Sequence, residues 1–394
     1  MKGWEVKRLG DLCSRITVGH VGSMASRYLE TGIPFLRSQN IKRGRIDFSS
    51  LKYIGPDFHQ QLRKSQLQPG DLAIVRTGEP GTAAVVPDGI GPLNCSDLVI
   101  ATPRDGVDVR FLCYAINETA QDFVQAHTVG AVQQHFNVAS AKAMTLHVPP
   151  LAEQCAISAV LGALDDKIAV NERIAATADQ LANAIFDGAV QAVSPRPMAE
   201  ILDPVLGGTP DRKVENFWEG DIPWASVKDV VNTVAGALVS TEECITELGE
   251  RGSRAKRMPA GSVILTARGT VGLVARLTMP AAFNQSCYAF VPGETPPAVL
   301  FHLIRLASRR MMGLAHGTVF STVNMKTFQH VEIPKIPKEL SDSLQGELGS
   351  LHELIEANLK QSLTLSSLRD TLLPQLMSGR IRVKDAEKIV EDHV

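Results

Sequence analysis

Two long stretches of the chain place apolar or small residues in alternating steps of three and four. The first, residues 151–193, begins directly after Pro149-Pro150, where a helix is expected to start. The second, residues 338–380, repeats the spacing. Such heptad steps are typical of helices that pair as a coiled coil. The seam positions are Ile157, Leu161, Leu164, Ile168, Asn171, Ala175, Ala178, Ala182 and Ile185, then Leu344, Leu348, Leu351, Ile355, Asn358, Ser362, Leu365, Arg369, Leu372 and Leu376.

Each seam carries an asparagine near its midpoint, Asn171 in the first stretch and Asn358 in the second. A seam asparagine costs stability but fixes the register, because its amide needs a polar partner. Two equal helices that run antiparallel meet at their midpoints. We therefore predict a hydrogen bond between Asn171 and Asn358; the alternative is that both are solvated.

The chain contains an internal sequence repeat that includes these two stretches. With a shift of 187 residues, Gly130 and Asn137 recur as Gly317 and Asn324, and the match continues through the helices without a gap. Upstream the shift drifts between 189 and 191, as loops of unequal length would produce. The upstream matches are Ile33-Pro34-Phe35 with Ile222-Pro223-Trp224, Pro69-Gly70-Asp71 with Ala260-Gly261-Ser262, and Asn94-Cys95-Ser96 with Asn284-Gln285-Ser286.

The repeat predicts a globular unit, a helix, a second globular unit and a second helix. Apolar runs at 72–75 and 263–265 follow turn residues and are typical of buried strands, and helical patches follow around 109–125 and 297–314. The fold class is therefore α/β (α+β): two similar domains separated by long helices that pair as an antiparallel coiled coil, with pseudo-two-fold symmetry. The predicted parts are residues 1–150, 151–193, 194–337, 338–380 and a tail at 381–394.

Composition places the chain among ordinary globular proteins. Of its residues, 44% are hydrophobic and 21% are charged. A length of 394 residues is enough for two domains with separate cores. We expect a cytoplasmic protein, because the start lacks an apolar signal region and no long apolar run could span a membrane. Six cysteines are scattered without a Cys-x-x-Cys pair, so we expect buried thiols and neither disulfides nor a zinc site.

The net charge of −2 divides unevenly along the chain. Residues 1–150 hold 16 basic and 13 acidic residues, and residues 197–337 hold 14 and 13, whereas each helical stretch is acidic. Mildly basic globular units suit contact with nucleic acid, and acidic helices suit solvent or a protein partner. Chance scatter of charge remains an alternative.

Polar residues suited to DNA fall where loops are expected in both units. Arginine, glutamine and asparagine pair bidentately with base edges, and lysine and serine suit phosphates. Apolar and glycine positions agree between the units while these polar positions differ, as expected of one fold that recognises two sequences. A solvated loop is the alternative for each residue. The candidates are Arg37, Ser38, Gln39, Asn40, Lys42, Arg43, Arg45, Arg76, Thr77, Gln133, Gln134 and His135, then Ser226, Lys228, Arg254, Lys256, Arg257, Arg268, Ser321 and Thr322.

Several catalytic motifs are absent from the sequence. It contains no Gly-x-x-x-x-Gly-Lys-Ser/Thr phosphate loop, no His-Glu-x-x-His metal pair and no Gly-x-Ser-x-Gly elbow. The Asn/Asp-Pro-Pro-Tyr/Phe tetrad of amino-methyltransferases is also missing. We therefore predict a DNA-recognition protein that has no catalytic residues, no metal ligands and no cofactor of its own.

The chain resembles a specificity subunit of a type I restriction–modification system. Each motif is weak alone, but their order together with the repeat is specific. The motifs are Trp4-x-x-x-Arg8-Leu9-Gly10-Asp11-Leu12, Pro150-Leu151-Ala152-Glu153-Gln154, Leu164-Asp165-x-Lys167-Ile168-x-x-Asn171, Gly207-Gly208-Thr209-Pro210 and Leu368-Arg369-x-x-Leu372-Leu373-Pro374-x-Leu376-x-Ser378-Gly379-x-Ile381. Ile336-Pro337-Lys338-Glu339-Leu340 departs from the family's usual entry into the second helix.

The resemblance implies two target-recognition domains, each of which binds one half of a bipartite site in double-stranded DNA. The paired helices would set the spacer and dock two methyltransferase subunits, and a restriction and translocase subunit would join the complex. S-adenosylmethionine, ATP and catalysis would belong to those partners. Two alternatives stay open: a protein-interaction scaffold that binds no DNA, and a methyltransferase in its own right, which the missing motifs disfavour.

Overall fold

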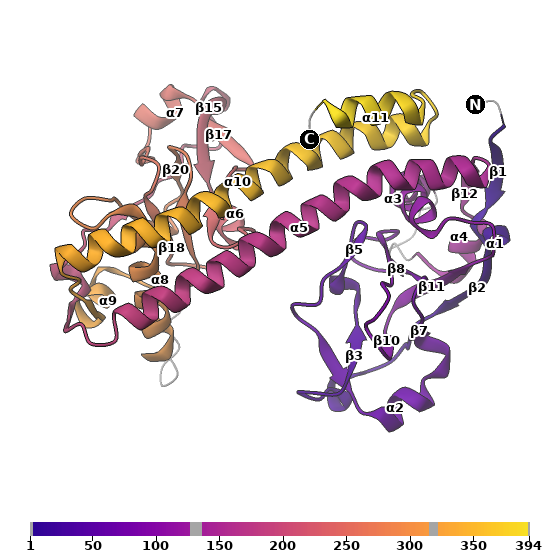
Figure 1. The fold of residues 1–394 in the computed structure, drawn as a ribbon, viewed down its shortest axis with the longest axis horizontal. Helices are drawn as coiled ribbons and strands as arrows, with labels where there is room; N and C mark the ends of the chain where they lie inside the picture. The colour runs from indigo at the N-terminus through magenta and orange to yellow at the C-terminus, as the bar shows by residue number, and fades with distance from the viewer. Residues whose placement is uncertain (1–2, 127–135, 315–321, 393–394) are drawn as a thin grey trace. The chain divides into compact units, whose positions relative to one another are not determined.

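The computed structural model describes residues 3–126, 136–314 and 322–392. It divides into two compact units (Figure 1): unit 1 comprises Met1–Asp166 and Leu365–Val394, and unit 2 comprises Lys167–Thr364. The helical stretches form α5 (Leu151–Ala189) and α10 (Lys338–Met377), and each helix contributes one end to each unit. Residues 1–150 thus belong to unit 1 and residues 194–337 to unit 2, and each unit also contains a segment of both helices.

Unit 1 contains two four-stranded sheets, with the strand orders β6-β3-β10-β7 and β2-β11-β8-β9. Strands β3 and β10 are parallel, and the second sheet is antiparallel. The strands of unit 1 are β1 (Glu5–Arg8), β2 (Cys13–Val18), β3 (Ile33–Leu36), β4 (Ile41–Lys42), β5 (Arg45–Ile46), β6 (Lys52–Ile54), β7 (Gln66–Leu67), β8 (Leu72–Val75), β9 (Ala83–Val85), β10 (Leu93–Cys95), β11 (Leu98–Pro103) and β12 (Thr145–Val148). Its helices besides α5 and α10 are α1 (Leu9–Leu12), α2 (Pro56–Gln61), α3 (Val109–Ala126), α4 (Val138–Ala143) and α11 (Val383–Glu391).

Unit 2 contains a five-stranded sheet, β14-β21-β18-β19-β16, and a three-stranded sheet, β17-β15-β20, in which β15 and β20 are parallel. Its strands are β13 (Pro195–Pro197), β14 (Val205–Leu206), β15 (Trp218–Ala225), β16 (Ala237–Leu238), β17 (Glu243–Ile245), β18 (Val263–Thr266), β19 (Val274–Leu277), β20 (Ala282–Phe283), β21 (Cys287–Phe290) and β22 (Glu332–Pro334). Its further helices are α6 (Val227–Val231), α7 (Glu247–Arg251), α8 (Pro297–Leu314) and α9 (Met325–His330).

The repeat in the sequence has a structural cause in matched elements of the two units. Each unit is closed by an antiparallel strand pair, β1 with β12 and β13 with β22. Asn137 accepts a hydrogen bond from the Ser140 backbone and caps α4, and Asn324 accepts from the Thr327 backbone and caps α9. An asparagine cap satisfies a donor that the first helical turn leaves open. These caps explain why Asn137 and Asn324 match.

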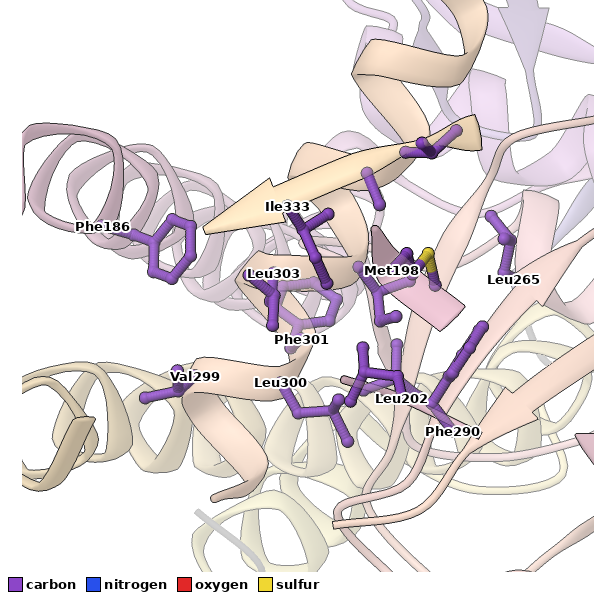
Figure 2. Packing of buried hydrophobic residues seen from close by; sticks show 14 of the residues in the cluster. Phe186, Met198, Leu202, Leu265, Phe290, Val299, Leu300, Phe301, Leu303 and Ile333 are labelled. Carbon is purple, nitrogen blue, oxygen red and sulfur yellow. The ribbon is translucent and has the colours of Figure 1, made fainter. Parts of the chain in front are cut away.

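The main core of unit 2 joins its globular domain to both long helices. Figure 2 shows Phe186 of α5 beside Leu303 and Ile333, with Phe290 further into the sheet. Leu344 and Leu348 of α10 belong to the same buried cluster. Burial of a large apolar side chain stabilises a fold by roughly 1.5–3 kcal/mol. The long helices are therefore part of the core and are not merely attached to it.

Segments of α5 and α10 run antiparallel within unit 2, because residues that increase in number along α5 meet decreasing numbers along α10. Asn171 bonds to Gln361, Ala175 clusters with Ile355 and Leu359, and Phe186 clusters with Leu348. The seam residues of α5 from Ile157 to Ala182 are buried. Most of the α10 seam is also buried as expected, namely Leu344, Leu348, Ile355, Ser362, Leu365, Leu372 and Leu376. At two positions, however, His352 and Leu359 are buried where Leu351 and Asn358 were expected.

The predicted bond between Asn171 and Asn358 is wrong. Asn171 is fully buried, and its amide nitrogen donates to the Gln361 Oε1 atom at 2.9 Å. Asn358 instead donates to the backbone oxygen of Leu354, one turn back in its own helix. Leu359 occupies the buried face in place of Asn358.

Four of the six free cysteines are buried, namely Cys13, Cys95, Cys113 and Cys287, whereas Cys244 is half-buried and Cys155 is exposed. The expectation of buried thiols is therefore wrong for Cys155. Burial raises the pKa of Cys13, Cys113 and Cys287 to about 12, which leaves them as unreactive thiols at neutral pH. No helix in the described ranges is long and apolar enough to cross a membrane.

Candidate nucleic-acid interface

The parallel strands β3 and β10 end at one edge of the unit 1 sheet, where their loops meet. The Ser96 backbone nitrogen donates to the Leu36 oxygen at 3.0 Å and holds the two strand ends together. A cavity of about 470 Å³ opens at this edge, and residues 37–42, 75–79 and 96–97 contribute its lining. The structure therefore brings together Arg37, Ser38, Gln39, Lys42 and Thr77, which lie in two separate segments of the sequence.

Two of the candidates at this edge shape the loop that carries them. Asn40 is fully buried, accepts from the Arg37 backbone nitrogen at 3.0 Å and donates to the Asp47 oxygen. Its side chain has no surface left for a base, so the prediction that it contacts DNA is wrong. The Arg37 guanidinium donates to the Ser50 oxygen at 2.9 Å, and its Nε atom is buried without a partner.

Two further candidates, Arg76 and Thr77, form hydrogen bonds with Asp97, a residue that the sequence analysis did not single out. Arg76 donates to the Asp97 carboxylate at 2.6 Å, and the Thr77 hydroxyl donates to its other oxygen at 2.9 Å. Asp97 has a φ of 52°, a left-handed conformation that a non-glycine residue adopts at a cost. Arg76 and Thr77 therefore position Asp97, and they are not free donors for DNA.

The hairpin of β4 and β5 presents the three remaining cationic candidates of unit 1. Lys42, Arg43 and Arg45 are exposed. Arg43 forms an ion pair with Glu118 at 2.9 Å. An exposed pair of this kind is worth at most about 1 kcal/mol, so it can open when a phosphate approaches. The hairpin is suited to contact a nucleic-acid backbone.

The equivalent edge of unit 2 lies at the ends of β15 and β20, where the Asn284 backbone nitrogen donates to the Ala225 oxygen at 3.0 Å. Ser226 caps α6: its hydroxyl accepts from the Asp229 backbone and donates to the Asp229 carboxylate at 2.6 Å. Lys228 is exposed and forms an ion pair with Glu242 at 2.7 Å. Ser226 therefore has a structural role that the sequence prediction missed, because a serine before a helix and a serine at a phosphate look alike.

The glycine loop at residues 207–210 packs closely on this edge. A Cβ atom on Gly207 would lie 2.2 Å from the Asn284 oxygen, and one on Gly208 would lie 2.2 Å from the Arg254 carbonyl carbon. Only glycine permits such an approach. The Thr209 hydroxyl then forms a short hydrogen bond with the Gln285 side chain.

Exposed cations surround this part of unit 2. Arg254, Lys256 and Arg268 are exposed, and none of them has an ion-pair partner within the parts of the chain that the structure describes. Arg257 differs, because it pairs with Glu250 at 2.9 Å. The three open cations can neutralise phosphates without first breaking a bond.

Sequence reasoning missed an aromatic cluster beside the glycine loop. The guanidinium carbon of Arg212 lies 3.8 Å from the ring centroid of Trp218, and both of its terminal nitrogens bond to Glu243. Trp224 packs edge-on against Trp218 and donates to the Gly208 oxygen at 3.0 Å. Tryptophan accounts for only three residues in this chain, so two of them six positions apart were an available signal.

One predicted match between the repeats is wrong in register. Cys95 pairs with Leu36, and Phe283 pairs with Ala225 in the same geometry. Asn94 therefore matches Ala282 and not Asn284. The two asparagines suggested the other match, but the loop before β21 is one residue longer in unit 2 than the corresponding loop before β11.

Four candidates, Gln133, Gln134, His135 and Ser321, lie outside the described residues. Thr322 is half-buried at the start of the next described segment.

The chain matches the family described as the type I restriction modification DNA specificity domain twice, over residues 1–180 and 195–343. The chain belongs to this family. The double match follows the repeat, since each match includes one of the two loop edges described above.

Relatives in this specificity family come from distant organisms. The chain is 28% identical over 165 residues to the type I restriction enzyme MjaIX specificity subunit of Methanocaldococcus jannaschii, which covers 41% of this chain and 38% of the relative. It is 28% identical over 181 residues to the HindI specificity subunit of Haemophilus influenzae, which covers 45% and 39%. The matched region thus spans less than half the length of these relatives.

A solved structure shares the fold across nearly the whole chain. The type I restriction–modification S subunit from M. genitalium aligns with a TM-score of 0.57 and 14% sequence identity, covering 95% of this chain and 96% of that one. At this identity the likeness establishes the architecture of two domains and two long helices.

Proposed function

We propose that this chain is the DNA-recognition subunit of a type I restriction–modification complex and has no catalytic activity of its own. The observation that carries the proposal is the double match to a DNA specificity domain, together with two loop edges that share a backbone but differ in side chains. Each unit binds one half of a bipartite site in double-stranded DNA. Base contacts specify the half-sites, and phosphate contacts position the units.

The long helices serve as a spacer and as the docking surface for partner subunits. Two methyltransferase subunits and a restriction and translocase subunit complete the complex in the cytoplasm. Those partners, and not this chain, bind S-adenosylmethionine and ATP. The continuous helices of α5 and α10 and their acidic charge support this part of the proposal.

The first test is to co-express the chain with the methyltransferase encoded beside it and to map modified adenines in the host DNA. A split motif is expected, and replacing residues 194–337 with a different recognition unit should change one half of the motif only. A stable complex with an intact methyltransferase that leaves the DNA unmodified would favour a protein scaffold instead.

The spacer role predicts a length effect. We would insert one heptad between Asp166 and Lys167 and a matching heptad between Thr364 and Leu365, so that both helices lengthen together. Each insertion adds roughly 10 Å of rise, or about three base pairs of duplex. The preferred gap between the half-sites should lengthen accordingly, and an unchanged gap would contradict the spacer role.

The open cations of unit 2 predict a salt effect. Replacing Arg254, Lys256 or Arg268 with alanine should weaken binding to all sequences alike and lower the slope of log K against log salt by roughly 1 per phosphate contact. Lys335→Ala is the control, because Lys335 is an exposed lysine of unit 2 that follows β22 and is not among the candidates for DNA contact. A variant that changes the motif but not the salt slope would show a base contact instead.

A further inference from the structure

One loop in each unit combines a fixed backbone with a different polar side chain. In unit 1 it is Ser96-Asp97, between β10 and β11; in unit 2 it is Asn284-Gln285-Ser286, between β20 and β21. Each loop follows the parallel strand that ends at the candidate interface. The matched backbone bonds to Leu36 and Ala225 show that Ser96 and Asn284 are equivalent. Asp97 and Gln285 are thus the next residues along equivalent loops.

The partly exposed Asp97 carboxylate is held by two side-chain hydrogen bonds. Its carboxylate accepts from Arg76 at 2.6 Å and from Thr77 at 2.9 Å, yet 41% of its side chain remains exposed. The shorter loop closes through the left-handed conformation of Asp97. Arg76 supplies the positive charge that lets a carboxylate face an anionic ligand. A carboxylate has about four lone-pair sites, so two sites remain for further donors.

Gln285 occupies the matching loop without that clamp. Ala267 and Arg268 stand where unit 1 has Arg76 and Thr77, since Gly272 bonds back to Thr266 as Gly81 bonds back to Val75. Gln285 is exposed and is held through its amide oxygen by Thr209. Its amide nitrogen donates to no other group within the part of the chain that the structure describes.

We propose that Asp97 and Gln285 each contact the edge of one base in their half-site and determine which base is accepted there. This rests on the proposed function. A carboxylate accepts from the N4 amino group of cytosine, whereas a glutamine amide pairs with N6 and N7 of adenine. Asp97 therefore selects cytosine, and Gln285 selects adenine. Asp97 is fixed by its two bonds before DNA arrives, which lowers the entropy cost of its binding.

The test maps modified adenines in cells that carry the full chain and its methyltransferase, with Asp97→Asn or Gln285→Glu. Asp97→Asn should relax the cytosine at one position of the unit 1 half-site, with a loss of discrimination of roughly 5- to 150-fold, and should leave the unit 2 half-site unchanged. Gln285→Glu should relax the adenine at one position of the unit 2 half-site and should leave the unit 1 half-site unchanged. Each variant is thus an internal control for the other.

Asp88→Asn is the matched control, because Asp88 is an exposed aspartate of unit 1 that does not line the cavity. It should leave the motif as in the wild type. Thr77→Val removes one of the two bonds on Asp97 and should weaken the discrimination while the preferred base stays the same. A purely structural role of Asp97 would instead lower activity on every sequence.

The outcomes separate this inference from the proposed function. A wild-type chain that directs no split motif overturns the proposed function. A wild-type split motif that both Asp97→Asn and Gln285→Glu retain overturns the base contacts alone. If Asp97→Asn abolishes modification, Gln285→Glu decides: an altered base in the unit 2 half-site supports the proposal, and an unchanged one overturns it.

Discussion

The two units solve one packing problem with different chemistry. In unit 1, α3 meets the long helices through Tyr114, whose hydroxyl donates to Asp165 at 2.5 Å, while Arg369 donates to the other oxygen of Asp165 at 2.7 Å. In unit 2, α8 meets them through His302, which lies 3.1 Å from His352 between ring nitrogens. At this position unit 1 thus uses an ion pair with a phenol, and unit 2 uses two imidazoles.

The difference shows that equivalent positions of the repeat can carry side chains of different chemistry. Asp165 and His352 occupy the same position of the two helices under the shift of 187. Burial, aided by the Asp165 charge, raises the pKa of Tyr114 and keeps its hydroxyl protonated. Burial, aided by Arg305 and Arg276, lowers the pKa of His302 to about 3 and that of His352 to about 2. The same position thus carries a polar contact between charged groups and a phenol in unit 1 and between two neutral imidazoles in unit 2.

The largest expected effect is a selective loss of stability of unit 2 in acid. An unfolded histidine takes up a proton near pH 6.5, but His302 and His352 resist it while folded. Their contribution is therefore complete above pH 6.5 and falls as the pH drops from 6.5 toward 3. Between pH 7 and pH 5 the loss is roughly 2 kcal/mol for each histidine. Hydrogen exchange, corrected for intrinsic rates, should show α8 losing protection while α3 retains it.

Replacing both His302 and His352 with leucine should abolish this acid sensitivity. His147, which is exposed on β12, provides the control, since His147→Leu should leave the difference between the units intact. Equal loss of protection in α3 and α8 would show that the histidine pair is not the cause.

A smaller effect is expected at the ion pair of unit 1. Arg369→Met leaves the Asp165 carboxylate with only the Tyr114 hydroxyl, and about 2 kcal/mol of unfolding free energy should be lost. Side-chain exposures of 26% and 31% let water compensate for part of the loss. Arg309→Met is the matched control, because the Arg309–Asp187 pair is 46% exposed on both sides. The control should change stability by less than about 1 kcal/mol in urea unfolding.

The smallest effect concerns the two repeated asparagines. Asn171→Leu should raise the free energy of unfolding by about 1 kcal/mol, because the buried Oδ1 atom of Asn171 has no partner and half-buried Gln361 can turn toward water. Asn358→Leu should change it by less than about 0.5 kcal/mol. A lower melting temperature for Asn171→Leu would mean that the bond to Gln361 outweighs the unpaired oxygen.

Much of the architecture could be predicted because it depends on local or periodic signals. The heptad spacing and the flanking prolines predicted both long helices, and the matched positions of Asn137 and Asn324 predicted the repeat. The seam of α10 was predicted less well. At two of its positions the buried residue is the next one along the helix: His352, which contacts His302 of the globular domain, and Leu359.

The candidate site was predictable only in part. The residue types at 37–42 identified one wall of the unit 1 cavity, but Asp97 and Gln285 were missed because single polar residues in short loops carry no periodic signal. Asn40 and Ser226 were taken for surface contacts because a cap and a ligand contact use the same side chains. Only the hydrogen bonds of the folded chain separate these roles.

The sequence by itself determined that there are two copies of one domain, two paired helices and a DNA specificity family, since repetition, periodicity and motif order are properties of the chain. The tertiary structure decided which polar groups form hydrogen bonds within the protein and which remain available to a ligand. That depends on where each donor finds its acceptor. Arg76 and Asp97 lie 21 residues apart in the sequence, yet their atoms lie 2.6 Å apart in the fold.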